Sequence, residues 1–302
     1  MEAPQLRPLG VGDIVDRVFS MYRQRALLFI ALSAVPYLAL VLVIGGIALS
    51  LGTQLAPLAS FFESFGNDPV SPDLILTPAI AGAFFTLIVV ALVAGLISVL
   101  FLSVQIGSLV DAAAARYLGR ETTVGASFRA GLRVAPKIIA TGLLLFFSLT
   151  VGWLVLFFLV VIANNALVAT LGILGGLVVT VFVFASWLVA PVVAAIEPVG
   201  PMHAVRRSWW LSNGHRWRIL GLQILLAVLQ AVLSTLISFI FIAAFITDAT
   251  VRLVLQNIVN VIATVLWAPV EWGTFTILYF DLRVRKEALD LQLAAEALPR
   301  EA

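Results

Sequence analysis

Long apolar runs separated by short polar segments dominate the pattern of this chain. Five runs carry at most one charged side chain each: residues 26–62, 74–110, 138–196, 219–247 and 253–280. A helix crosses the hydrocarbon core of a bilayer with about 20 residues, so the run of 59 residues at 138–196 is long enough for two crossings. The pattern therefore predicts six membrane-spanning helices, at about 26–51, 76–110, 138–163, 170–196, 217–247 and 253–280.

The third run also contains its own turn signal. Asn164 and Asn165 stand near its middle, and Gly172, Gly175 and Gly176 follow them. None of the five runs alternates apolar and polar residues over about ten positions, as strands of a membrane β-barrel would. We therefore predict an all-α membrane protein whose residues 1–302 form a single polytopic domain.

The segment before the first span has a helical pattern of its own. Apolar residues recur at the spacing of one helix face, at Val11, Ile14, Val15, Val18, Phe19 and Tyr22. This spacing predicts an amphipathic helix at 11–24 that lies in the membrane interface. Similar segments precede spans three and five, at 122–137 and 200–221, and Pro136 either stops the first of these helices or kinks it into its span. We expect three hairpins of two spans, each preceded by a cytoplasmic interfacial helix.

Composition supports the membrane class and excludes several others. Hydrophobic residues make up 62% of the chain and charged residues 11%, whereas soluble domains have about 25% charged residues. The net charge of +2 does not give the evenly basic surface that nucleic acid requires. The absence of cysteine excludes disulfides, thiol catalysis and cysteine-ligated metals, and it leaves the redox compartment undetermined.

The basic residues lie almost entirely on one side of the predicted membrane. Seventeen of the 18 Lys and Arg residues fall before span one, between spans two and three, between spans four and five, or after span six, and Arg252 is the exception. The positive-inside rule places that side in the cytoplasm. Both termini are therefore expected inside, with 281–302 as a cytoplasmic tail. No signal peptide is expected, because a charged segment precedes the first span.

Three segments resemble a known family. They are "RPLGVGDIVDRVFSMYRQR" at the start, "APVVAAIEPVGPMHAVRRSWWLSNGHRWRILG" in the middle and "LYFDLRVRKEALDLQL" at the end. They are similar to segments of the glycerophosphoryl diester phosphodiesterase membrane-domain family. The resemblance implies a six-span module of the bacterial inner membrane. Some members of that family are fused to a soluble phosphodiesterase domain, and this chain shows none.

Glu271 is the residue that the membrane pattern does not explain. An acidic residue at the centre of a membrane helix costs roughly 2.5–3.5 kcal/mol. It is either an intramembrane proton or substrate site, or a protonated carboxyl hydrogen-bonded inside the bundle. The candidate partners for the second role are Asn257, Asn260, Gln223 and Gln230.

The basic cytoplasmic segments suggest contact with anionic lipid or with a membrane or cytoplasmic partner protein. The candidate contact residues are Arg17, Arg23, Arg129, Arg133, Arg206, Arg207, Arg283, Arg285 and Lys286. Glu197 is followed by Arg206 and Arg207, and it is either an ion-pair partner or an ordinary interfacial charge.

A hydrolytic site is not expected, because His203 and His215 have no cluster of carboxylates around them. We expect no metal and no cofactor. The sequence favours a non-enzymatic membrane module that binds anionic lipid and docks a partner. The alternative is a transporter for a small or lipid-like substrate that uses Glu271.

Overall fold

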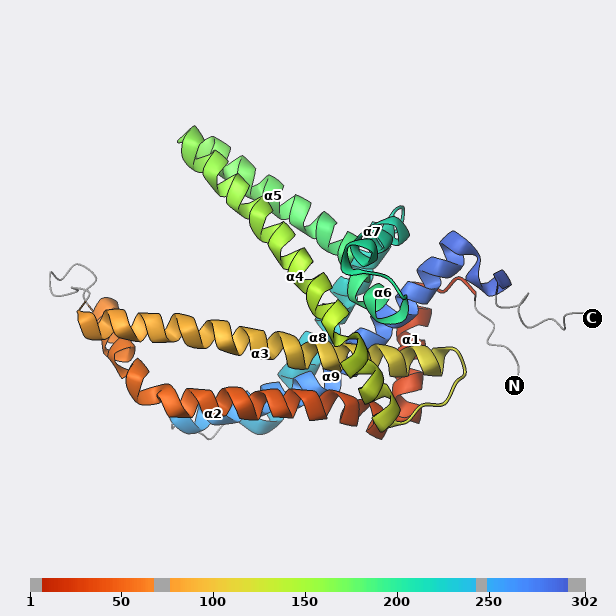
Figure 1. The fold of residues 1–302 in the computed structure, drawn as a ribbon, viewed down its shortest axis with the longest axis horizontal. Coiled ribbons are helices and arrows are strands. Elements are labelled where there is room, and N and C mark those ends of the chain that lie inside the picture. The colour runs from red at the N-terminus through yellow and green to blue at the C-terminus, as the bar shows by residue number, and fades with distance from the viewer. Residues whose placement is uncertain (1–6, 68–76, 243–248, 293–302) are drawn as a thin grey trace, which may run out of the picture. The chain divides into compact units, whose positions relative to one another are not determined.

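The computed structural model describes residues 7–67, 77–242 and 249–292, and all regular structure in these ranges is helical (Figure 1). The helices are α1 (Val11–Gln24), α2 (Ala26–Asn67), α3 (Pro78–Tyr117), α4 (Val124–Ala163), α5 (Ala166–Trp187), α6 (Ala190–Ile196), α7 (Pro201–Ser212), α8 (Arg216–Ile242) and α9 (Ala249–Glu287). Within these described ranges, six helical segments are long and apolar enough to cross a membrane, and one of them comprises α5 with α6. The all-α class and the number of spans predicted from the sequence are confirmed.

The chain divides into two units. The first contains residues 1–34 and 103–302, and the second contains residues 35–102. Within the second unit, α2 remains helical through Pro36 and Pro57, and the Phe61 and Phe84 rings meet edge to face with their centroids 5.6 Å apart. Every candidate functional residue lies in the first unit, so the sites described below belong to that unit.

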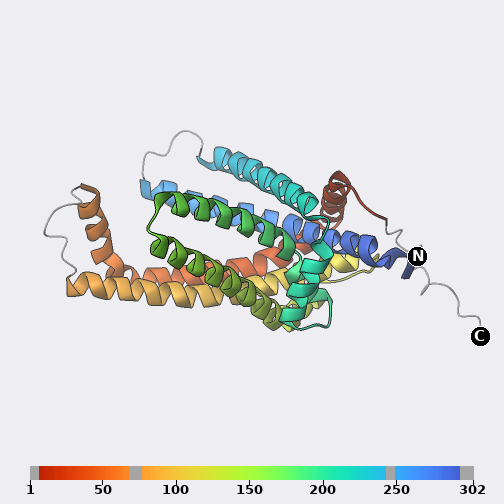
Figure 2. The same cartoon turned by 90° about the horizontal axis from the view of Figure 1, so that it is seen from above.

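The turn predicted at Asn164 and Asn165 joins α4 to α5. Asn164 ends α4 in the left-handed conformation, with a φ of 43°, which asparagine tolerates better than most residues. The Asn165 side chain begins α5 by accepting hydrogen bonds from the backbone N–H groups of Leu167 and Val168. α4 and α5 pack against each other, as do α8 and α9 (Figure 2). The arrangement of all six spans as three hairpins stays a prediction.

The fourth span differs from the continuous helix expected at 170–196. α5 ends at Trp187 and a separate short helix, α6, begins at Ala190. Pro191 explains the break, because in a continuous helix its ring would collide with the carbonyl of Trp187, four residues earlier. At the start of α6 the missing N–H of proline costs nothing.

Two other boundaries also differ from the expectation. α4 runs from Val124 through Pro136 without a break, so the helix expected before span three is the first part of α4 and not a separate element. Proline is tolerated inside membrane helices because neighbouring groups satisfy the freed carbonyl. α9 does not end at Phe280 but continues to Glu287, so residues 281–287 are helical. α7 begins at Pro201 and ends just before Gly214, which has a φ of 83°.

The core of the first unit includes one face of α1. Ile14, Val18 and Met21 are buried there, and α1 packs against α9 near Gly273. The apolar stripe seen in the sequence thus contacts protein over much of its length, while Phe19 stays exposed. Placement of α1 in a membrane interface stays a prediction.

Candidate functional site

A buried carboxylate joins the start of the chain to its last long helix. The Asp281 side chain of α9 has no exposed surface. It accepts hydrogen bonds from the backbone N–H of Leu9 at 2.7 Å, from Arg218 Nη1 at 2.6 Å and from Arg285 Nε at 3.0 Å. Both arginines also donate to the carbonyl oxygen of Leu9. The N–H and the carbonyl oxygen of Leu9 are therefore both hydrogen-bonded to side chains of α8 and α9.

A second network uses another face of the same helix end. Tyr279, Arg283 and Glu287 follow one another at intervals of four residues. The Tyr279 hydroxyl donates to Glu197 Oε1 at 2.8 Å, and Arg207 Nε donates to the same oxygen at 3.1 Å. Arg207 also pairs with Glu287, which accepts from Arg283 Nε at 2.8 Å.

Arg283 in turn donates to the Tyr279 hydroxyl at 3.3 Å, so the five side chains form a closed ring. Burial alone would lower the pKa of Arg207, but hydrogen bonds to Glu287 and Glu197 outweigh burial and raise that pKa above its ordinary value. Two arginines and two glutamates balance one another, so the ring has little net charge for a ligand. These side chains hold α7 and the end of α6 against α9.

His215, which precedes α8, lies near the basic residues of these networks. Burial lowers its pKa below the ordinary value. The positive charges of Arg285 and Lys286 lower it further. The lowered pKa favours the neutral form of the imidazole. In the described part of the chain no group of three His, Asp or Glu side chains could hold a metal ion.

The nine basic residues expected to contact lipid or a partner fall into two groups. Arg207, Arg283 and Arg285 form ion pairs within the chain. Lys286 lies over the Trp210 ring, 5.7 Å from its centroid. The others are exposed: Arg17, Arg23, Arg129, Arg133 and Arg206. Of these, Arg129 donates to the carbonyl of Gly125 in its own helix.

A small pocket lies between α1 and the end of α3, and we call it the Arg17–Arg116 pocket. Its volume is about 270 Å³, and it is lined by Arg17, Ser20, Met21, Gln24, Arg116 and Tyr117. Tyr117 is only 6% exposed, and its hydroxyl is one of the few buried side-chain groups in the described ranges without a hydrogen-bond partner.

The guanidinium groups of this pocket are not neutralised. Arg116 Nε is also buried without a partner in the described residues, although Arg116 Nη2 donates to Gln24 at 3.1 Å. The Arg17 guanidinium lies 5.2 Å from the centroid of the Tyr117 ring. No carboxylate lines the pocket, so its polar lining is rich in donors and positively charged.

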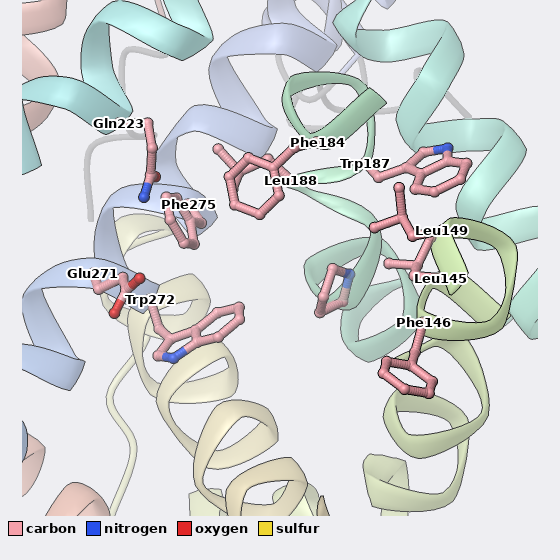
Figure 3. A pocket seen from close by; sticks show the side chains of 11 residues that line it. Leu145, Phe146, Leu149, Phe184, Trp187, Leu188, Gln223, Glu271, Trp272 and Phe275 are labelled. Carbon is pink, nitrogen blue, oxygen red and sulfur yellow. The ribbon is translucent and has the colours of Figure 1, made fainter. Parts of the chain in front are cut away.

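Glu271 lines a different cavity, of about 320 Å³ (Figure 3). Gln223, one of its four expected partners, lines the same cavity, whereas Asn257, Asn260 and Gln230 do not. No ion pair or hydrogen bond to Glu271 is formed by the described residues, and Gln223 Oε1 is buried without a partner there. Apart from these two residues the lining is apolar, so it offers no polar path to Glu271.

Sequence reasoning found Glu197 and Glu271 but missed several partners. Glu197 pairs with Arg207 and not with Arg206. The sequence did contain a signal for Tyr279, Arg283 and Glu287: their spacing of four residues indicates that they share one helix face. The partners contributed by distant segments left no such signal: Leu9, Arg116, Tyr117 and Arg218.

No family model, curated protein or solved structure matches this chain. The resemblance to the glycerophosphoryl diester phosphodiesterase membrane-domain family stays a prediction from the three segments that suggested it. In the structure these segments contact one another, because Leu9 comes from the first, Glu197 and Arg218 from the second and Asp281 from the third.

Proposed function

We propose that this protein is a non-enzymatic integral membrane module that binds the phosphate group of an anionic phospholipid in the Arg17–Arg116 pocket. One observation supports the proposal above the others. Arg17 and Arg116, which have no acidic partner in the described chain, line one pocket together with Tyr117, whose hydroxyl is buried and unpartnered in the described residues. Unmade hydrogen bonds of buried groups are costly, and a phosphate oxygen would satisfy these donors.

The chemistry of the pocket fits phosphate better than other common headgroup features. Guanidinium groups match the spacing of phosphate oxygens and remain charged at all relevant pH values. A hydrogen bond from a charged donor is shorter and roughly twice as strong as a neutral one. We assign the Tyr117 hydroxyl as a third donor to the phosphate, so the proposed site selects for an anion that accepts several hydrogen bonds.

The position of the pocket fits a lipid of the inner leaflet. α1 precedes span one, and Arg116 and Tyr117 end span two, at the side that the positive-inside rule assigns to the cytoplasm. Anionic lipid attracts every nearby basic residue by about 1 kcal/mol. The proposed selectivity comes from the pocket in addition to this general attraction.

The test compares two double variants that lose the same charge. Arg17→Gln with Arg116→Gln alters the pocket, and Arg129→Gln with Arg206→Gln alters two exposed arginines elsewhere. Each purified protein is equilibrated in mixed micelles with equal phosphatidylglycerol and phosphatidylcholine, and the retained lipid is identified by native mass spectrometry. The wild type and the control variant should retain phosphatidylglycerol preferentially, whereas the pocket variant should lose that preference.

Tyr117→Phe removes only the hydroxyl and should weaken retention by about fivefold, the value of one ordinary hydrogen bond. Equal losses in the two double variants would show that the attraction is general and that the pocket is not a lipid site. Absence of any retained anionic lipid in the wild type would also refute the proposal. Docking of a partner protein stays a prediction, because no contact in the structure identifies a partner.

A further inference from the structure

The cavity at Glu271 combines one carboxylate with aromatic walls that come from several helices (Figure 3). α9 contributes Glu271, Trp272 and Phe275 to it. α4 and α5 supply Phe146, Phe184 and Trp187 together with aliphatic side chains, and α8 supplies Gln223. None of these residues lines the Arg17–Arg116 pocket, so the cavity is a separate feature of the first unit.

The cavity contains one carboxylate, and no basic side chain of the described chain lines it to offset that charge. Within the described residues neither the Glu271 carboxyl nor Gln223 Oε1 has a hydrogen-bond partner, and no basic side chain lines the cavity. A buried acceptor that has lost water without gaining a donor destabilises the state that contains it. The carboxylate therefore lacks a positive charge beside it, and a ligand could supply one.

We infer that the cavity binds an organic cation with an apolar body, whose ammonium group faces Glu271 and Gln223. Charge complementarity with the single carboxylate selects a cation. Trp187 and Trp272 also line the cavity. Tryptophan gives the strongest cation–π attraction, which increases when water is excluded. The apolar body of the ligand replaces water or lipid against Leu145, Leu149 and Phe275.

Other ligand classes fit the same cavity less well. An anion would meet the carboxylate with no basic residue to offset the repulsion. A metal ion would find one carboxylate and one amide, fewer ligands than such ions require. A hydrated inorganic cation would lose water to an apolar lining that cannot replace it. The volume of about 320 Å³ is at the lower end of the range for small-molecule sites.

The test uses two ligands of the same shape that differ in charge, 4-phenylbutylammonium and 4-phenylbutanol. Their binding to the purified full-length protein in neutral detergent micelles is measured by isothermal titration calorimetry. The wild type should bind the ammonium compound at least about tenfold more tightly than the alcohol, because a hydrogen bond to a charged group is worth that much or more. Glu271→Gln should abolish this preference and leave binding of the alcohol unchanged.

Two further variants make the result specific to the cavity. Glu121→Gln removes a carboxylate whose side chain is 77% exposed, so it loses the same charge outside the cavity and should keep the preference. Gln223→Leu should weaken binding of the ammonium compound several-fold through loss of the second acceptor. Equal affinity of the wild type for both ligands, or a preference that survives Glu271→Gln, would overturn the inference. Neither outcome affects the phospholipid proposal, which rests on other residues.

Discussion

Asp281 shows how a single carboxylate can organise basic residues that the sequence presents as lipid contacts. Its side chain is fully buried, while those of Arg218 and Arg285 remain 20% and 28% exposed. Three donors and two positive charges stabilise the carboxylate in this position. Removing the carboxylate would leave the N–H of Leu9 without its acceptor. The two guanidinium groups would lose the negative charge beside them and keep only the carbonyl oxygen of Leu9 as an acceptor.

Asp281→Asn should therefore lower the free energy of unfolding by about 3–5 kcal/mol, the usual cost of breaking a buried ion pair from one side. The measurement is unfolding of the purified protein in mixed detergent micelles with increasing dodecyl sulfate. Glu121→Gln provides the matched control, because its pair with Arg25 has side chains that are 53% and 77% exposed. That substitution should cost less than about 1 kcal/mol, and equal costs for both would contradict the role given to Asp281.

Individual residues could be predicted where their chemistry conflicts with their surroundings. Glu271 was identifiable because it is the only charge in an apolar run, and Glu197 because two arginines follow it closely. The roles of Arg207, Arg283 and Arg285 were not identifiable, because an arginine near a membrane looks the same in sequence whether it meets lipid or an internal acid. The acceptor on Leu9 is its backbone carbonyl oxygen. Every residue has this group, so the residue type does not identify it.

At the scale of helices, turn signals were more reliable than prolines. Asn164 and Gly214 each stand at a helix boundary, where their backbone preferences act locally. Pro136 lies just before the apolar run 138–196 and Pro191 lies within it, yet only Pro191 coincides with a break. Whether a membrane helix continues past proline depends on which neighbours satisfy the freed carbonyl, and the local sequence does not contain that information.

The contact between α3 and α4 depends on a glycine whose importance appears only in the structure. A Cβ on Gly131 would stand 2.1 Å from Ser108 Oγ and 2.6 Å from the carbonyl oxygen of Val104. Both atoms belong to α3, and the Val104 oxygen is backbone, so it cannot move by a simple rotation of a side chain. Close approach of helices at small residues is a common means of association in membranes.

Gly131→Ala should consequently destabilise the protein by about 1–3 kcal/mol, the range for overpacking. The same unfolding assay measures this loss. Gly142→Ala is the control in the same helix, since a Cβ there meets nothing within 4 Å. The control should be neutral or slightly stabilising, because alanine favours helix over glycine by up to about 1 kcal/mol. Similar destabilisation by both variants would refute the close contact.

At the scale of the whole molecule, the distribution of charge predicts orientation better than it predicts binding. The positive-inside bias counts Lys and Arg during insertion, before their side chains have found partners. After folding, Arg207, Arg218, Arg283 and Arg285 are paired with acids. The number of spans therefore followed from apolar length alone, whereas the arrangement of helices and the identity of the unpaired arginines required tertiary contacts.

The predicted orientation can be tested with single cysteines, because the chain has none of its own. Glu121→Cys lies between α3 and α4, and Ala166→Cys lies at the start of α5, beside the opposite turn. In intact cells a membrane-impermeant maleimide should label Ala166→Cys, and Glu121→Cys should react only after the membrane is opened. The reverse pattern would place both termini outside.

The contact between Leu9 and Asp281 also bears on the order in which the protein is assembled. These residues are separated by 272 positions, so Leu9 leaves the ribosome long before its acceptor has been synthesised. Until α8 and α9 are inserted, the polar groups of Leu9 lack Arg218, Asp281 and Arg285. Docking of Leu9 is thus delayed until residue 281 has been synthesised, and a chain that stalls before that point would retain an undocked N-terminal segment.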